Sequence, residues 1–138
     1  MASNPTRKMY VNLAVQEVSR SIMFFTKLGF TFNPEFTDDQ SACMVINPDA
    51  CVMLLNKPFF KTFMRRDLCN TASHGEGFIA LACSSRVEVH DLVNRAIQAG
   101  GRPTMDAMDR GFLYEWGFYD LDGHQWDLLW VKPTGTVM

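Results

Sequence analysis

The feature that most constrains the fold is an order of elements that occurs twice in the chain. In the first half, residues 9–15 alternate large apolar residues with smaller or polar ones, which predicts a strand. Apolar residues at helical spacing follow, and Gly29 is the expected C-terminal cap of that helix. Three short strand-like runs come next, at residues 30–33, 42–46 and 51–55. The first half therefore predicts a βαβββ unit.

The second half repeats this order from Gly77. Residues 78–83 predict a strand, Ser84 or Ser85 is placed to cap a helix, and Gly100-Gly101 ends that helix. Strand-like runs follow at residues 102–105, 112–119 and 125–131. We therefore expect one α+β domain over residues 1–138, made of module one at residues 9–56, a linker at residues 57–76 and module two at residues 77–132. The linker contains Phe59, Phe60 and Phe63, which predict a short amphipathic helix.

Composition excludes several classes of protein. With 47% hydrophobic residues in 138 positions, the chain cannot be mostly disordered. A net charge of −2 leaves no excess of positive charge for a nucleic-acid partner. No apolar run approaches the ~18 residues of a membrane span, and the polar start lacks the apolar stretch of a signal peptide. Cys43, Cys51 and Cys83 lie among apolar residues without CxxC spacing, which favours reduced thiols over a zinc site or disulfides. These features predict a soluble cytoplasmic protein.

Three segments in this order resemble one known superfamily. They are YVNLAVQEVSRSIMFFTKLGF at residues 10–30, FIALACSS at residues 78–85 and FYDLDGHQWDLLW at residues 118–130. Together they resemble the motifs of the vicinal oxygen chelate superfamily, which includes glyoxalase I, the bleomycin- and fosfomycin-resistance proteins and the extradiol dioxygenases. The resemblance spans roughly residues 9–131. It implies that each module forms a curved sheet, and that two such sheets pair around a cavity.

The resemblance also implies where a metal would bind, because four side chains of the metal-dependent members point into that cavity. Carried over to this sequence, those positions fall on Tyr10, Leu54, Phe78 and Asp127. Only Asp127 readily binds a hard divalent cation, since a neutral phenol is a poor ligand and Leu54 and Phe78 offer no lone pair. We therefore expect no metal and no other cofactor. A register shifted by two residues would instead gather Asn12, Asn56, Gln125 and Asp127, although neutral amides bind transition metals poorly.

The three histidines do not obviously restore a metal site. His90 falls within the second predicted helix, and His124 follows the glycine of the turn before residues 125–131. We expect both to be exposed or locally hydrogen-bonded. His74 lies in the loop before module two, where nothing in the sequence fixes its position.

The expected cavity wall is apolar and aromatic with a few polar anchors, as in small-molecule pockets. The candidate ligand-binding residues are Tyr10, Asn12, Leu54, Phe78, Trp116 and Asp127. Parity alone leaves open whether Tyr114, Trp116 and Phe118 or Leu113, Glu115 and Gly117 face the cavity. By contrast, Trp126, Leu128 and Trp130 alternate on one face and are expected in the core.

Three functions from different classes fit this wall. The first is a protein that binds a small, aromatic or hydrophobic molecule without metal. The second is a glyoxalase-type lyase, isomerase or dioxygenase, which would use an atypical metal site or Asp127 as base and Tyr10 as proton donor. The third is an interaction module whose cavity is vestigial. A homodimer is expected by resemblance, with modules pairing within one chain or between chains.

Overall fold

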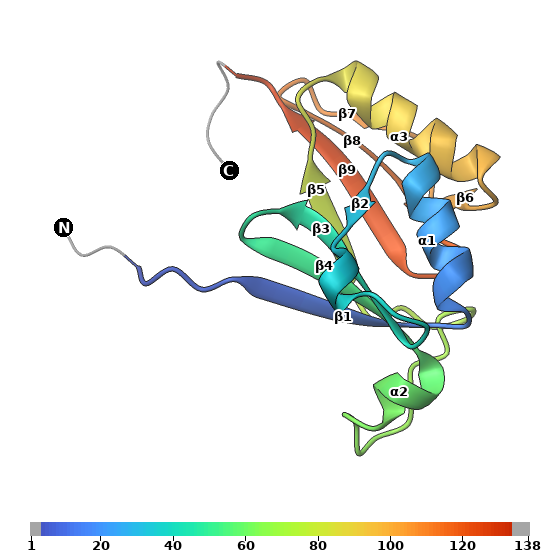
Figure 1. Ribbon diagram of the computed structural model, residues 1–138. Helices are drawn as coiled ribbons and strands as arrows, with labels where there is room; N and C mark the ends of the chain where they lie inside the picture. Colours follow the sequence, from blue (N-terminus) through green and yellow to red (C-terminus); the bar gives the residue numbers. More distant parts are fainter. Residues whose placement is uncertain (1–3, 134–138) are drawn as a thin grey trace. The chain divides into compact units, whose positions relative to one another are not determined.

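The computed structural model describes residues 4–133 and divides into two compact units, Met1–Leu68 and Cys69–Met138 (Figure 1). Each unit contains one sheet and carries the predicted βαβββ order. The predicted α+β class and its twofold repeat of modules are therefore confirmed. No helix within residues 4–133 is both long enough and apolar enough to cross a membrane.

The first unit builds a four-stranded sheet in the order β1-β4-β3-β2. β1 and β4 are parallel neighbours, whereas β3 pairs antiparallel with both β4 and β2. The short linker helix that Phe59 and Phe60 predicted is present, with the side chain of Asn56 as its N-cap. The elements are β1 (Met9–Val15), α1 (Val18–Lys27), β2 (Thr31–Phe32), the 3-10 helix η1 (Pro34–Phe36), β3 (Ser41–Asn47), β4 (Ala50–Asn56) and α2 (Lys57–Lys61).

The two faces of this first sheet differ in burial. Leu13 pairs with Leu54 in the parallel register of β1 and β4, and both side chains are buried. Tyr10 and Asn12 alternate with Leu13 and therefore point from the opposite face, where both are exposed. Because α1 contacts β3 and β4 and buries Phe24 and Phe25, the Leu13 face is the one that α1 covers.

The second unit builds a five-stranded sheet with the order β5-β9-β8-β6, and β7 also pairs with β8. β5 and β9 are parallel, and the remaining pairs are antiparallel. The two-residue strand β7 was not predicted. The elements are β5 (Phe78–Ala82), α3 (Arg86–Gln98), β6 (Arg102–Pro103), β7 (Met108–Asp109), β8 (Leu113–Tyr119) and β9 (Gln125–Val131).

Helix α3 covers one face of this second sheet, lying along β8 and β9 (Figure 1). The Ser85 hydroxyl accepts the Glu88 N–H at 3.1 Å, and the Glu88 carboxylate accepts the Ser84 N–H at 2.7 Å, so the helix begins as the sequence predicted. Trp126 and Leu128 are buried on the covered face. The other face of the sheet carries the candidate site, and we call it the open face.

Candidate functional site

Side chains on the open face of the second sheet form rows that run across the strands. Phe78 pairs with Gln125, Gln125 with Tyr119, and Tyr119 with Arg102. Residues in register on neighbouring strands point to the same face, about 4.8 Å apart. The first row therefore presents a phenyl ring, an amide, a phenol and a guanidinium in that order.

The second row contains the one predicted metal position that has a carboxylate. Asp127 pairs with Ala80 on one side and with Gly117 on the other. A Cβ on Gly117 would lie 2.6 Å from Asp127 Oδ1 and 2.7 Å from the Trp126 carbonyl oxygen. Gly117 is therefore required for the carboxylate to lie across β8. The two rows are linked because Gln125 Nε2 donates to Asp127 Oδ1 at 3.1 Å.

Asp127 lines a cavity of about 210 Å³ beside β8, which we call the Asp127 cavity. The Trp116 indole N–H donates to the Met105 carbonyl at 2.7 Å, which fixes one wall. Arg110 pairs with Glu115 at 3.3 Å, so the carboxylates of Asp106 and Asp127 leave the cavity acidic. Its lining comprises Thr104, Met105, Asp106, Met108, Arg110, Glu115, Trp116, Gly117 and Asp127.

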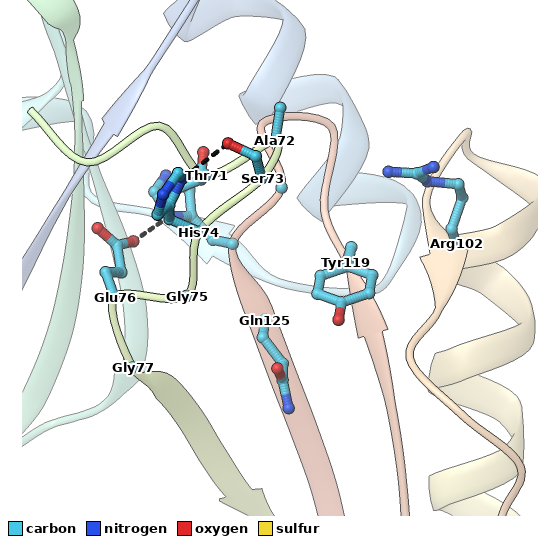
Figure 2. Close-up of a pocket in the computed structure, with 12 residues that line it drawn as sticks. Thr71, Ala72, Ser73, His74, Gly75, Glu76, Gly77, Arg102, Tyr119 and Gln125 are labelled. Atoms are coloured by element: carbon cyan, nitrogen blue, oxygen red, sulfur yellow. Dashed lines mark hydrogen bonds and ion pairs between the residues drawn. The ribbon is translucent and has the colours of Figure 1, made fainter.

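A second cavity, of about 250 Å³, lies along the first row, and we call it the Arg102 cavity (Figure 2). One wall is the loop of residues 71–77, and the other is formed by Arg102, Tyr119, Gln125 and the turn before β9. The loop is attached to this turn because the Thr71 hydroxyl donates to the Asp122 carbonyl and Glu76 bonds to His124.

His124 lines the Arg102 cavity, and its contacts were only partly predicted from the sequence. Its side chain is only 4% exposed, and its Nδ1 is hydrogen-bonded to the carboxylate of Glu76, 48 positions earlier in the chain. Its backbone N–H donates to the buried Asp120 at 3.0 Å, which is the local bond that was expected. Burial raises the pKa of the Asp120 carboxyl, while His124 and three donors, including the Trp126 indole at 3.0 Å, oppose that rise.

The structure brings some of the predicted site residues together and separates others. Phe78, 61% exposed, shares the open face with Asp127. Trp116 lines the Asp127 cavity, but its ring belongs to the face covered by α3, where it lies 5.2 Å from the ring of His90. The register of β8 with β9 shows which alternating residues of β8 share the face of Asp127. They are Leu113, Glu115 and Gly117.

The prediction that Leu54 shares a wall with Tyr10 is wrong. Leu54 is completely buried on the α1-covered face, whereas Tyr10 is 53% exposed on the opposite face with Asn12. The residue of β4 that faces the same way as Asn12 is its register partner Met53. The error arose because the apolar run of β4 is buried on both faces and has no period of two.

Comparison with known proteins agrees with this architecture. A family model described as bleomycin resistance protein-like N-terminal matches residues 7–47. A hypothetical protein of Staphylococcus aureus, SA1046, is 28% identical, with a TM-score of 0.77 over 91% of this chain and 94% of that chain. A glyoxalase-related enzyme from Fulvimarina pelagi gives a TM-score of 0.78 at 16% identity, over 97% of this chain and 98% of that chain.

The chain has the fold of the glyoxalase/bleomycin resistance/dioxygenase proteins, and the family match over residues 7–47 supports the vicinal oxygen chelate superfamily. The fosfomycin resistance protein FosX of Mesorhizobium loti shares this fold, with a TM-score of 0.65, 14% identity and 97% of both chains covered. No curated protein sequence matches the chain significantly.

The side chains at the four positions implied by the resemblance do not suit the superfamily's metal. With Met53 in place of Leu54, the four positions offer a phenol, a thioether, a phenyl ring and one carboxylate, whereas hard divalent cations need several oxygen ligands. The alternative set also fails, because Asn56 pairs with Val15 on the α1-covered face, opposite Asn12. Within residues 4–133, no three or more His, Cys, Asp or Glu residues are grouped to hold a metal ion.

Proposed function

We propose that this protein binds a small aromatic or hydrophobic molecule, without a metal ion, on the open face of its second sheet, with Asp127 as the polar anchor. The observation that carries this proposal is the Asp127 cavity, where a carboxylate lies beside methionine and tryptophan. The resemblance assigns that carboxylate to one position of the superfamily's metal site. The superfamily's resistance proteins and glyoxalase relatives make a small organic ligand the natural class of partner.

Apolar contact supplies the main attraction in this proposal. Met105 is 59% exposed and Met108 is also exposed, and both line the cavity with Trp116. Methionine side chains are flexible and adapt to flat or irregular ligands. A ligand that removes about 200 Å² of apolar surface from water gains about 5 kcal/mol before the cost of association.

The carboxylate of Asp127 orients the ligand in this proposal. Its Oδ1 accepts the Gln125 amide, while Oδ2 has no hydrogen-bond partner among residues 4–133. Asp106 adds a second carboxylate to the lining, and Arg110 is already paired with Glu115. The cavity therefore favours a ligand that carries an N–H or O–H donor or a positive charge on an apolar body.

The test is a titration with benzylamine, phenol and toluene in the presence of a chelator, followed by the amide resonance of Gly117. We expect saturable shifts for benzylamine and phenol, and a loss of affinity of about tenfold for benzylamine in Asp127→Asn. Asp91→Asn is the matched control, because Asp91 makes only a surface pair with Arg95 on α3. If none of these ligands moves Gly117, the cavity is vestigial and the proposal fails.

The enzymatic alternative, with Asp127 as base and Tyr10 as proton donor, stays a prediction. Tyr10 belongs to the first unit and Asp127 to the second. Turnover of a glyoxalase-type substrate that persists in both Asp127→Asn and Tyr10→Phe would remove that mechanism. The proposed homodimer is tested by light scattering of the eluting protein, where a monomeric mass would contradict it.

A further inference from the structure

We infer that the Arg102 cavity is a second binding site, separate from the Asp127 cavity, which takes the oxyanion of a small organic acid or of phosphate. The site is built entirely within the second unit, between the first row of the open face and the loop of residues 71–77. It uses none of the residues that line the Asp127 cavity.

The guanidinium of Arg102 is the central group. Arg102 and Tyr119 are register partners on β6 and β8, so their side chains leave the same face of the sheet. Figure 2 shows the Arg102 side chain extending toward the loop that carries Ser73 and His74, on the cavity side of the strand. Among residues 4–133, no carboxylate lies within ion-pair distance of Arg102. Its five donors are therefore available to a ligand.

The charges around the cavity favour an anion. Glu76 is the only carboxylate in the lining, and the imidazole of His124 binds it. No ion pair among residues 4–133 involves Arg102, so its positive charge remains available to an anion, with His74 as a further ionisable group in the lining. The Asp127 cavity has the opposite character, because its one arginine is paired and two carboxylates remain. Two neighbouring cavities of opposite charge do not compete for one ligand class.

The shape of the cavity suits a small oxyanion. A guanidinium presents two parallel N–H donors that match the two oxygens of a carboxylate or phosphate. Two glycines leave the opposite wall open, since a Cβ on Gly75 or on Gly77 would meet no atom within 4 Å. At about 250 Å³ the cavity lies below the usual range for drug-sized ligands, so the ligand is a single ring or smaller.

The experiment uses the glycine amides of the full chain as reporters in ¹⁵N-labelled protein. Gly75, Gly77 and Gly123 line the Arg102 cavity, whereas Gly117 lines the Asp127 cavity. The probes are benzoate, inorganic phosphate and the neutral isostere benzamide. We expect saturable shifts of the first three glycines with benzoate, with phosphate or with both, and none with benzamide. A response to benzoate alone identifies an organic acid as the source of the oxyanion, and a response to phosphate alone identifies phosphate.

Substitutions of Arg102 then test whether its guanidinium binds the anion. Arg102→Gln is expected to weaken binding by about tenfold or more, because it removes a charge-assisted hydrogen bond. Arg102→Lys keeps the charge but loses the paired donors. Its affinity is therefore expected to lie between that of the unmodified protein and that of Arg102→Gln. Arg95→Gln is the matched control on exposed α3, and its affinity is expected to equal that of the unmodified protein.

Three results would overturn the inference. They are the absence of a saturable shift with either anion up to about 10 mM, equal binding of benzamide and benzoate, and equal affinities of Arg102→Gln and Arg95→Gln. A shift of Gly117 with benzylamine but no response of the Arg102 cavity to anions leaves the proposed function standing and refutes this second site alone. Because Arg102 is exposed, its variants are expected to fold. Unchanged ¹⁵N amide resonances outside the Arg102 cavity verify this.

Discussion

Replacing Leu54 by alanine tests the face assignment of β4, on which the description of the first sheet depends. Leu54 is completely buried, with Leu13 beside it on β1 and the fully buried Ala42 on β3. Such a site collapses poorly around a deletion, so Leu54→Ala is expected to destabilise the protein by about 3–5 kcal/mol. That is a large part of the roughly 5–15 kcal/mol that a domain has.

The neighbouring residue provides the matched comparison. Met53 is half-buried on the opposite face of the same strand, so Met53→Ala is expected to cost about 1 kcal/mol. Urea unfolding followed by far-UV circular dichroism measures both changes. With an m-value of about 2 kcal/mol/M, the midpoint of Leu54→Ala falls by roughly 2 M. If Met53→Ala is instead the more damaging change, and Leu54→Ala costs under about 1 kcal/mol, β4 is shifted by one residue and our reasoning is refuted.

Three further predictions concern individual groups. Burial raises the pKa of Cys83 to about 12, so a thiol reagent near neutral pH is expected to label the exposed Cys69 first. Peptide mapping measures the order of labelling, and rapid labelling of Cys83 would contradict the prediction. Ser85→Ala removes the N-cap of α3 and is expected to lower the free energy of unfolding by about 1 kcal/mol in urea. Because the folded-state pKa of Asp120 lies above 3.8, the folded state binds this proton more tightly, and the Asp120 contribution to stability declines as pH rises from 3.8 through the folded pKa. Asp120→Asn is expected to flatten that part of the stability profile, and an unchanged slope argues against it.

The controls for these measurements are available in the chain. Ser19→Ala, at an exposed position early in α1 where no side-chain cap is formed, is expected to change stability little beside Ser85→Ala. Asp109 provides the opposite case to Asp120. Hydrogen bonding from Arg86 lowers the pKa of Asp109, so that carboxyl is expected to titrate below 3.8 in a carboxyl NMR titration.

Most of the fold could be predicted because its signals are local. The bounds of β1 and β9 follow directly from alternation at residues 9–15 and 125–131. The glycine expected to end α1 adopts a positive φ of 99°, and its N–H bonds to the Thr26 carbonyl. Trp126 and Leu128 are in the core as predicted, because their alternation in β9 identifies one face.

The site was harder to predict, because it depends on register and on distant contacts. The face of Leu54 was missed since β4 has no period of two, and the choice between Trp116 and Gly117 needed the pairing of β8 with β9. The bond between Glu76 and His124 joins positions 48 residues apart, and no local pattern announces it. An acidic residue in the linker just before module two was the only signal in the sequence.

The most direct test of the central claim is the dependence of ligand binding on metal. The titration of benzylamine against the Gly117 amide is repeated after exhaustive chelation and again with added Mn²⁺, Zn²⁺ or Ni²⁺. A metal-free site anchored by Asp127 predicts the same affinity in all these conditions. Binding that disappears on chelation and returns with one of these ions would contradict the account, because it would mean that the protein assembles a metal centre from residues that we judge unfit for one.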